Sequence, residues 1–256
     1  MPAALITGAT SGIGAAFARV LAARGADVIL VARDTNRLAE AAAEISDRFS
    51  VSAETLAADL ADRRDVDRVA ARLADDDRPI DLLVNNAGFA NRVALTGDDL
   101  SLHDLAIDVM IRAVLVLGGV AGRAMRRRGS GCIINVSSTS GFMALGNYSA
   151  IKAWVTTYSE SLAVELAGTG VNVTALCPGW VRTEFHERAA IDTQTIPSWL
   201  WLDPDTTVRR GLADAEHGRV ISIPSKRYRA LMLMVRHVLP RAAVRAVSKR
   251  MSSGRR

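Results

Sequence analysis

Tyr148 and Lys152 are two side chains whose types and spacing suit them to moving a proton. They lie four positions apart in the segment GNYSAIKAW, residues 146–154, and a helix there would make them neighbours on one face. A tyrosine hydroxyl has an ordinary pKa of about 10, and acid–base work near neutral pH favours a lower one. A cation one helical turn away stabilises the phenolate, and a pKa of about 7 needs about 4 kcal/mol of such help. An aromatic residue and a cation that simply share a helix face are the alternative interpretation.

A glycine-rich turn near the start of the chain has the composition of a phosphate-binding loop. In TGATSGIG, residues 7–14, the glycines are spaced G-x-x-x-G-x-G between a predicted strand and a predicted helix. Glycines there let the backbone approach a pyrophosphate, which the unpaired N–H groups of a helix N-terminus attract. A tight turn without a ligand also uses glycine, but the position at the first strand-to-helix turn favours a nucleotide.

The end of the second predicted strand bears on which nucleotide binds. The segment LVARD places Arg33 directly after this strand, where dinucleotide folds meet the adenosine ribose. An acidic side chain would accept a hydrogen bond from a ribose 2′-hydroxyl, whereas an arginine pairs with a 2′-phosphate. Arg33 therefore predicts NADP(H). The alternative is a surface arginine beside Asp34 at the start of a helix.

The elements that must position these residues alternate between strand and helix. Strand-like apolar runs are expected at 3–7, 27–33, 51–60, 79–88, 131–138, 171–179 and 218–224. Helical patterns are expected at 13–25, 35–49, 63–76, in a long segment ending near 128, and from Tyr148 onward. Apolar strands separated by helices form a parallel sheet covered on both faces. The sequence therefore predicts an α/β fold, a single doubly wound domain of the Rossmann type.

Composition narrows the class of protein further. The chain has 256 residues and only two cysteines, Cys132 and Cys177, so we expect no disulfide framework and a cytoplasmic location. The N-terminal residues show no pattern of a signal peptide. The most apolar long stretch, residues 105–122, contains Asp108 and Arg112, which favours a helix packed inside the protein over a membrane span.

Charge is unevenly distributed along the chain. The net charge is +5, yet no acidic residue follows Glu216, while eleven Lys and Arg residues do, so residues 1–216 carry −6. We therefore divide the chain into a domain at 1–225 and a basic amphipathic tail at 226–256. A solvated, partly disordered end is the favoured expectation for this tail, with peripheral contact to an anionic membrane as the alternative. Nucleic acid is not expected as a partner, because no aromatic stacking platform accompanies the charge.

Five motifs occur in an order that resembles the short-chain dehydrogenase/reductase family. They are the glycine turn, NNAG at 85–88, NVSS at 135–138, YSAIK at 148–152 and PGWVRT at 178–183. The resemblance spans about residues 3–187 and implies an NADP(H)-dependent, ketoreductase-like enzyme that interconverts a carbonyl and a secondary alcohol.

The resemblance also implies catalytic roles. Tyr148 would be the general acid/base, and Lys152 would lower its pKa and bind the nicotinamide ribose. Ser138 would hydrogen-bond the substrate carbonyl oxygen, with Ser137 as the less favoured choice. By the same resemblance the protein would assemble as a homodimer or homotetramer.

The cofactor-binding residues follow from the same motifs. Asp59 would contact the adenine ring. Asn86 and Gly88 would line the adenosine half of the cofactor. Gly179 and Thr183 would lie near the nicotinamide. The full expected set is Gly8, Thr10, Ser11, Gly12, Ile13, Gly14, Arg33, Asp59, Leu60, Asn86, Ala87, Gly88, Tyr148, Lys152, Pro178, Gly179, Val181 and Thr183. Ordinary turns at NNAG and CPGW, and a helix N-cap at Asp59, are the structural alternatives. The four scattered histidines predict no metal site.

Two departures from the family pattern bear on activity. Met110 occupies a position where the family usually has an asparagine that supports a water chain from the lysine, and methionine hydrogen-bonds poorly. Ser138 and Tyr148 are ten positions apart, closer than the family commonly shows, so their loop must turn tightly. A catalytically weak NADP(H)-binding redox sensor or partner-binding protein is therefore the alternative function.

A substrate lid is expected at about 184–212. Its apolar residues predict a small hydrophobic carbonyl or alcohol as substrate, or else packing against the core or a neighbouring subunit. They are Phe185, Ile191, Ile196, Trp199, Leu200 and Trp201.

Overall fold

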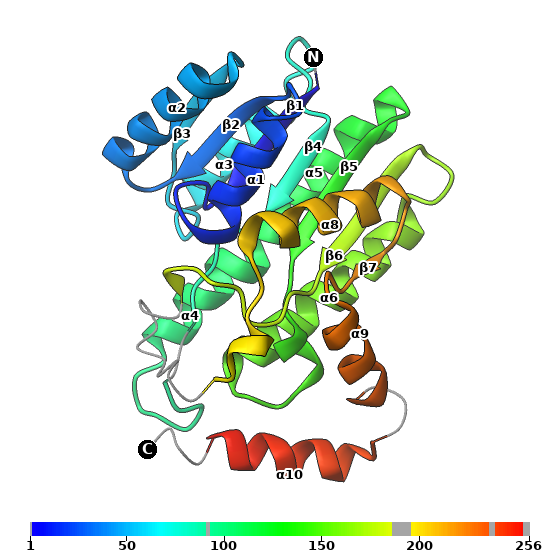
Figure 1. Ribbon diagram of the computed structural model, residues 1–256. Helices are drawn as coiled ribbons and strands as arrows, with labels where there is room; N and C mark the ends of the chain where they lie inside the picture. The colour runs from blue at the N-terminus through cyan, green and yellow to red at the C-terminus, as the bar shows by residue number, and fades with distance from the viewer. Residues whose placement is uncertain (1, 91–92, 186–195, 236–238, 253–256) are drawn as a thin grey trace.

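The computed structural model describes residues 2–90, 93–185, 196–235 and 239–252. Its centre is one parallel sheet of seven strands in the order β3-β2-β1-β4-β5-β6-β7 (Figure 1). The strands are β1 (Ala3–Thr7), β2 (Asp27–Ala32), β3 (Ala53–Ala57), β4 (Leu82–Asn85), β5 (Gly131–Val136), β6 (Val171–Leu176) and β7 (Ile221–Ser222). This topology confirms the predicted doubly wound Rossmann-type fold.

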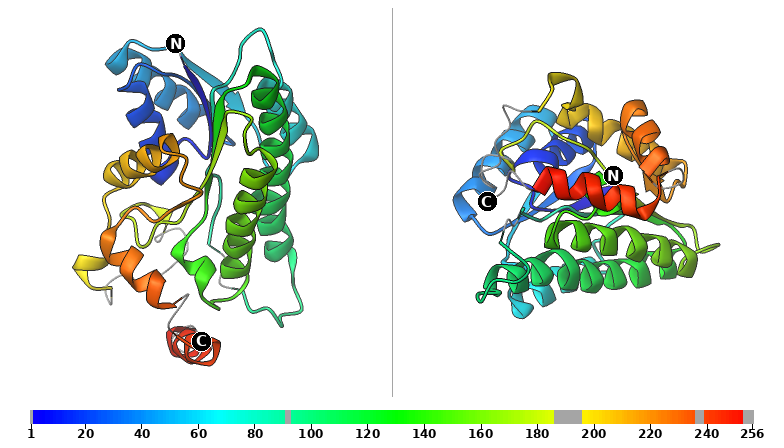
Figure 2. Two further views of the ribbon diagram at one scale, coloured as in Figure 1. Left: turned by 90° about the vertical axis from the view of Figure 1, so that its right-hand side faces the viewer. Right: turned by 90° about the horizontal axis from the view of Figure 1, so that it is seen from below.

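Helices cover both faces of the sheet, as the two views of Figure 2 show. One face carries α1 (Gly12–Ala22), α2 (Thr35–Phe49) and α8 (Pro204–Glu216); the other carries α3 (Arg63–Leu73), α5 (Ala113–Arg128) and α6 (Asn147–Glu165). Each face is sealed by its own apolar cluster, with Phe17 and Leu30 fully buried in one and Leu83 and Leu117 in the other. Burial on both sides explains why the strands read as continuous apolar runs.

Helix starts follow local capping chemistry. Asp34 caps α2, Asp62 caps α3 and Asp203 caps α8, each accepting from backbone N–H groups of the first turn. Asp59, for which a helix cap was the structural alternative, accepts from Ala61 N in a turn instead, so that alternative is wrong.

The long helix predicted to end near residue 128 is interrupted. It consists of α4 (Ser101–Ile107), a π-helical turn (Asp108–Arg112) and α5. Among the described helices, Ser101–Arg128 alone is long and apolar enough to cross a membrane by length and composition. It packs against the sheet and α6, with Leu117 and Met125 fully buried.

The basic tail is ordered over its described residues. It forms α9 (Lys226–Leu233) and, after Pro240, α10 (Arg241–Ser252). Tyr228 and Met232 of α9 and Val244 and Ser248 of α10 are buried. The favoured expectation of a solvated, partly disordered end is therefore wrong for these residues, because spaced apolar side chains dock them on the domain.

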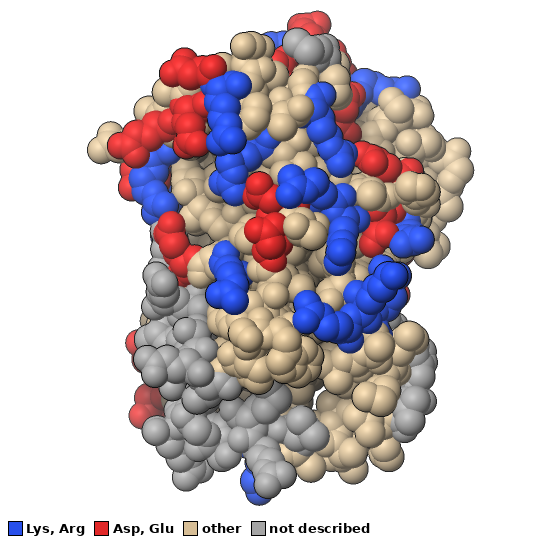
Figure 3. Space-filling view, viewed as in Figure 1, with Lys and Arg blue, Asp and Glu red and all other residues tan. Residues whose placement is uncertain are grey.

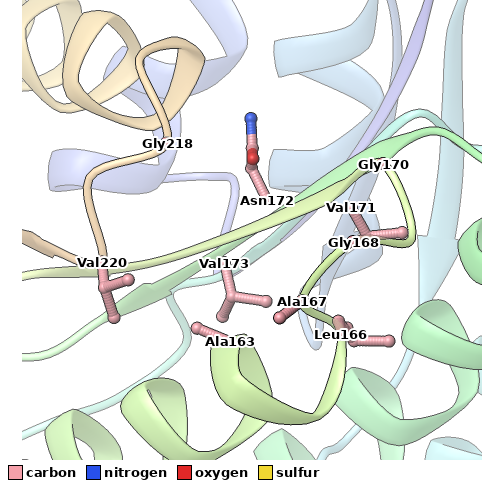
Figure 4. A pocket seen from close by; sticks show the side chains of 10 residues that line it. All are labelled: Ala163, Leu166, Ala167, Gly168, Gly170, Val171, Asn172, Val173, Gly218 and Val220. Atoms are coloured by element: carbon pink, nitrogen blue, oxygen red, sulfur yellow. The ribbon is translucent and has the colours of Figure 1, made fainter.

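Two cavities lie away from the motifs. One of about 220 Å³ is lined by Gly168, Val171 and Asn172, among others, at the amino end of β6 (Figure 4). The second, of about 320 Å³, is lined by residues that include Ala3, Leu82 and Cys132. Both open at the amino ends of the strands, whereas the sequence motifs lie at the carboxyl ends.

Candidate active site

The predicted motifs meet at the carboxyl edge of the sheet. The glycine turn follows β1, NNAG ends β4, NVSS ends β5 and PGWVRT follows β6. Since all strands are parallel, these segments converge on one edge. Strand order reverses between β1 and β4, and ligands of doubly wound folds bind at such a switch point.

The glycine turn forms a cradle that side chains would fill. Gly8 and Gly12 have φ values of 65° and 54°, a region that favours glycine. A Cβ on Gly14 would lie 2.1 Å from the Gly8 carbonyl oxygen and 2.5 Å from Asn86 Nδ2. Ser11 is the N-cap of α1 and, within the described residues, its side chain makes no capping hydrogen bond. This helix start therefore presents backbone N–H groups to an anion, and it fits a dinucleotide pyrophosphate.

NNAG supports the glycine turn directly. Asn86 Nδ2 donates to the carbonyl oxygens of Thr7 at 2.9 Å and Gly8 at 3.3 Å. Thr7 Oγ1 in turn accepts from the backbone N–H groups of Asn86 at 2.9 Å and Ala87 at 3.0 Å. Asn86 and Ala87 thus hold the end of β1 in place. Thr7 is fully buried and was not singled out from the sequence, because a threonine in a strand carries no distinctive signal.

PGWVRT contacts the glycine turn from the β6 side. A Cβ on Gly12 would lie 3.3 Å from the Thr183 side chain, so these two motifs touch. The Pro178 carbonyl accepts from Thr139 N at 3.0 Å, which ties the turn to the NVSS loop. Val181 pairs with Leu202 in an isolated parallel bridge. Ile13, at the start of α1, is half-buried. It packs against the apolar cluster beneath α1 on one side and against the cluster that contains Val181 and Leu202 on the other.

Tyr228 of α9 is a positioning residue that the sequence did not reveal. Its ring lies against Gly179, where an added Cβ would be 2.1 Å from Cζ. Its hydroxyl accepts from Trp180 N at 3.1 Å and donates to the Leu200 carbonyl at 2.9 Å. The tail helix therefore fixes both the Gly179 turn and the segment around Leu200.

Arg33 and Arg37 flank the glycine turn from the β2 side. Arg33 is exposed directly after β2, and Asp34 caps α2. Arg37, which the sequence analysis did not select, donates from Nη2 to the Thr10 carbonyl at 3.1 Å. It also pairs with Glu184 at 3.6 Å, so one side chain links the glycine turn to the segment after β6.

Asp59 and Leu60 lie at the end of β3. Asp59 is half-buried and closes its own turn through Ala61 N, at 3.0 Å from Oδ1, while its backbone N–H donates to Asp65 Oδ2 at 2.7 Å. Leu60 is buried. Asp59 Oδ2 takes no part in these two hydrogen bonds.

The two serines after β5 have different surroundings. Ser137 Oγ donates to the Lys152 carbonyl at 2.7 Å and lies 2.8 Å from Thr156 Oγ1, so it is committed to α6. Ser138 caps a 3₁₀ turn (Thr139–Phe142) and its hydroxyl also hydrogen-bonds Tyr148. This geometry favours Ser138 over Ser137 as the partner of a reacting oxygen.

Tyr148 lies in the first turn of α6 among apolar groups. Its ring centroid is 5.9 Å from that of Phe185, and Lys152 Nζ lies over the ring, 5.6 Å from the centroid. Desolvation raises the pKa of the hydroxyl above its ordinary value, and the hydrogen bond from Ser138 opposes this. The net direction is opposite to the fall that the spacing from Lys152 predicted, because burial is the largest cause of the shift in this pKa.

Lys152 is a buried cation at the centre of the site. It is 5% exposed, and Nζ donates to the Val136 carbonyl at 2.7 Å. Burial lowers its pKa to about 8. Its protonation can therefore change close to neutral pH.

Met110 lies beside Lys152 and Gly88. A Cβ on Gly88 would be 2.8 Å from Met110 Sδ and 3.8 Å from Lys152 Nζ. Met110 is 1% exposed and belongs to the π-helical turn, a feature frequent at functional sites. A thioether thus occupies the space next to the lysine where a polar group would extend a proton path.

The short loop between Ser138 and Tyr148 closes through two glycines. A Cβ on Gly141 would lie 2.8 Å from the Lys152 backbone carbon, so the loop packs directly on α6. Gly146 has φ 85° immediately before α6, a value that suits glycine. Ten positions are sufficient because the loop folds as a single 3₁₀ turn.

His103 supports the start of α6 from α4. It is buried, with Nδ1 3.0 Å from Asn147 Nδ2 and Nε2 3.2 Å from the Ala94 carbonyl. Both contacts are satisfied when Nδ1 accepts from Asn147 and Nε2 donates to the Ala94 carbonyl. Since Asn147 immediately precedes Tyr148, this pair helps to orient the tyrosine. Within the described residues, no group of three His, Cys, Asp or Glu side chains could hold a metal ion.

The lid is partly described. Phe185 contacts Tyr148, Trp180 lies 5.8 Å from Trp201 between ring centroids, and Ile196 and Leu200 are half-buried. Trp199 is 58% exposed. Ile191 lies outside the described residues.

Comparisons with known proteins agree with this arrangement. A family model described as short chain dehydrogenase matches residues 2–194. A protein of Streptomyces violaceoruber, named as a ketoacyl reductase of the granaticin polyketide synthase, is 39% identical over 198 residues, covering 73% of this chain and 70% of that protein.

Solved structures extend the likeness to most of the chain. A short-chain dehydrogenase from Sphingobium yanoikuyae in complex with NADPH has a TM-score of 0.83 at 36% identity, covering 90% of this chain and 92% of that one. A bulky-bulky ketone specific alcohol dehydrogenase from Comamonas testosteroni has a TM-score of 0.79 at 29% identity, covering 94% and 97%. The chain therefore belongs to the short-chain dehydrogenase family, as an oxidoreductase that acts on carbonyl or alcohol groups with a nicotinamide cofactor.

Proposed function

We propose that the protein is an NADP(H)-dependent oxidoreductase that interconverts a hydrophobic carbonyl compound and its secondary alcohol. The observation that carries this proposal is the meeting of Ser138, Tyr148 and Lys152 beside the glycine cradle. The bound nicotinamide would supply or receive hydride. We propose the cofactor-binding residues inferred from the motifs, with Arg37 added to them.

The roles of the three side chains follow from their surroundings. Ser138 would donate to the carbonyl oxygen of the substrate, and Tyr148, which neighbours it, would give that oxygen its proton. The ammonium of Lys152, held by the Val136 carbonyl, would stabilise the tyrosinate left after the transfer. Because desolvation raises its pKa, Tyr148 carries its proton at neutral pH, and the Lys152 ammonium would offset the cost of releasing it.

The apolar lid supports a hydrophobic substrate. Phe185 lies against Tyr148, and the half-buried Ile196, Leu200 and Trp201 follow in the same segment. An apolar wall of this kind binds an apolar body while a few polar groups orient the reacting carbonyl.

The preference for NADP(H) is tested by fluorescence titration with NADPH and NADH. We expect the wild-type protein to bind NADPH tightly and NADH weakly, because Arg33 can pair with a 2′-phosphate. Arg33→Ala should raise the Kd for NADPH by about tenfold or more and leave that for NADH unchanged, since a charge-assisted hydrogen bond contributes about 1.5–3 kcal/mol. Arg64→Ala, an exposed arginine of α3, is the matched control.

Two other outcomes of the titration would count against the proposal. Equal affinity of the wild-type protein for NADH and NADPH would remove Arg33 as the 2′-phosphate partner. Binding of neither nucleotide would contradict the dehydrogenase function itself.

A catalytically weak NADP(H)-binding redox sensor or partner-binding protein is the second candidate, and Met110 favours it. Met110→Asn should raise turnover without altering cofactor affinity, because an amide beside Lys152 can extend the proton path. Steady-state kinetics with a ketone panel measures the change, and Met110→Leu is the apolar control. An unchanged or lower rate for Met110→Asn would show that the proton path does not use this position.

We also propose the domain boundaries, the membrane contact, the oligomeric state and the location of the protein. We infer a domain at 1–225, with a lid at about 184–212, and a basic tail at 226–256 in contact with an anionic membrane. Exposed apolar side chains on α5 and α6, such as Leu115 at 50% and Val164 at 78%, support a homodimer or homotetramer. Two free cysteines, Cys132 and Cys177, support a cytoplasmic location.

A further inference from the structure

The end of the molecule beyond the carboxyl edge of the sheet carries exposed apolar side chains. Leu231 and Leu233 of α9 and its C-cap residue Met234 are 40%, 56% and 51% exposed. Leu239 is 40% exposed, and Trp199, in the 3₁₀ turn Ser198–Leu200, is 58% exposed. We call these five residues the apolar tip. Figure 2 places α9, α10 and this turn together at one end of the protein.

Contacts hold the elements of the apolar tip against the site. The Tyr228 hydroxyl donates to the Leu200 carbonyl at 2.9 Å, which joins α9 to the turn that carries Trp199. Ser248 of α10 accepts from Ala144 N at 3.2 Å, in the loop between Ser138 and Tyr148. The tip therefore lies beside the lid, and α10 lies beside the loop between Ser138 and Tyr148.

Basic residues accompany the apolar tip. Lys226 and Arg227 are exposed in the first turn of α9, and Arg245 is exposed on α10. No acidic residue follows Glu216 in the sequence, whereas the preceding part of the chain has a net charge of −6. In Figure 3, acidic and basic side chains intermingle over the upper body, while the described lower surface is mostly uncharged.

We propose that the apolar tip docks on an anionic phospholipid bilayer. Apolar side chains that enter the boundary of the acyl chains, with lysine and arginine at the headgroup level, are the pattern of interfacial anchoring. The negative charge of residues 1–216 is repelled by the same surface, so the tail and the carboxyl edge face the membrane. One consequence of this docking rests on the proposed function. A carbonyl compound dissolved in lipid would enter the active site directly from the bilayer.

Co-sedimentation with vesicles tests the docking. The full-length protein should bind vesicles of phosphatidylcholine with phosphatidylglycerol, and bind vesicles of phosphatidylcholine alone much more weakly. Leu233→Ser/Met234→Ser should lower the partition coefficient by about tenfold or more, through lost apolar burial. Lys226→Gln/Arg227→Gln should lower it by about tenfold or more, through lost attraction to anionic lipid.

Matched substitutions elsewhere provide the controls. Arg63→Gln/Arg64→Gln on α3 removes two exposed basic groups away from the tip, and should leave vesicle binding unchanged. NADPH titration of every variant separates the two proposals. Tip variants that keep their NADPH affinity but lose vesicle binding would support the docking face. If neither the wild-type protein nor any variant binds NADPH, the dehydrogenase function is refuted, and the docking proposal is judged by the vesicle experiment.

Two results would overturn the inference. One is the absence of binding to anionic vesicles, or equal binding by the wild-type protein and both tip variants. The other is a halved particle mass of Leu233→Ser/Met234→Ser in light scattering without vesicles, which would show that a second copy of the chain covers the tip.

Discussion

Replacement of Tyr148 by phenylalanine should lower the turnover of a ketone substrate by about 10³-fold, in the middle of the range for loss of a general acid. In the proposed mechanism the hydroxyl gives the carbonyl oxygen its proton, and the substitution removes this hydroxyl while it retains the ring that packs on Phe185. NADPH affinity and thermal stability should therefore stay near the wild-type values. Stopped-flow reduction of a ketone and NADPH titration measure the two properties separately.

Ser137→Ala and Ser138→Ala are the comparison pair for this result. Ser138→Ala should lose turnover with little loss of stability, whereas Ser137→Ala should mainly lose stability, because its hydroxyl bonds the Lys152 carbonyl. Turnover by Tyr148→Phe within about tenfold of the wild type would exclude the tyrosine as the acid.

The pH dependence of reduction adds an independent check on the same site. Burial lowers the pKa of Lys152 to about 8, so its ammonium is lost as pH rises through this value. The tyrosinate formed by proton donation then loses its neighbouring positive charge. We expect kcat for ketone reduction to be highest below about pH 8 and to fall above it. A rate that rises through pH 9 would contradict this role of Lys152.

Replacement of Gly14 by alanine should abolish measurable NADPH binding and destabilise the protein by about 1–3 kcal/mol. The new Cβ would lie 2.1 Å from the Gly8 carbonyl oxygen and 2.5 Å from Asn86 Nδ2. Gly8 follows β1, and Asn86 follows β4 and hydrogen-bonds the end of β1, so relief of the clash must move the glycine turn or the Asn86 side chain that holds it. Calorimetry gives the stability, and fluorescence titration gives the affinity.

Gly119→Ala is the matched control for Gly14→Ala. Gly119 lies within α5, and an added Cβ would meet only Arg123 Nη1, at 3.5 Å. The same substitution there should leave NADPH affinity unchanged and stabilise the helix by about 1 kcal/mol, since alanine is a better helix former. Wild-type affinity in Gly14→Ala would show that the cradle does not hold the cofactor.

The local sequence determined the fold and the place of the site. The predicted strand at 3–7 and helix at 35–49 match β1 and α2, because runs of apolar residues and the Asp34 cap encode these elements over short distances. The glycine turn, Tyr148 and Lys152 lie at the ends of those elements. A parallel sheet brings such ends to one edge whatever their separation along the chain.

Only the tertiary structure decided how these groups behave. It separates Ser138 from Ser137 and raises the pKa of Tyr148 where its spacing from Lys152 predicted a fall, because desolvation depends on every element packed around α6. It also orders the basic tail, whose Tyr228 meets Gly179 across 49 positions of sequence. Periodicity describes neighbours within one element, whereas these outcomes depend on contacts between elements that no short segment of sequence contains.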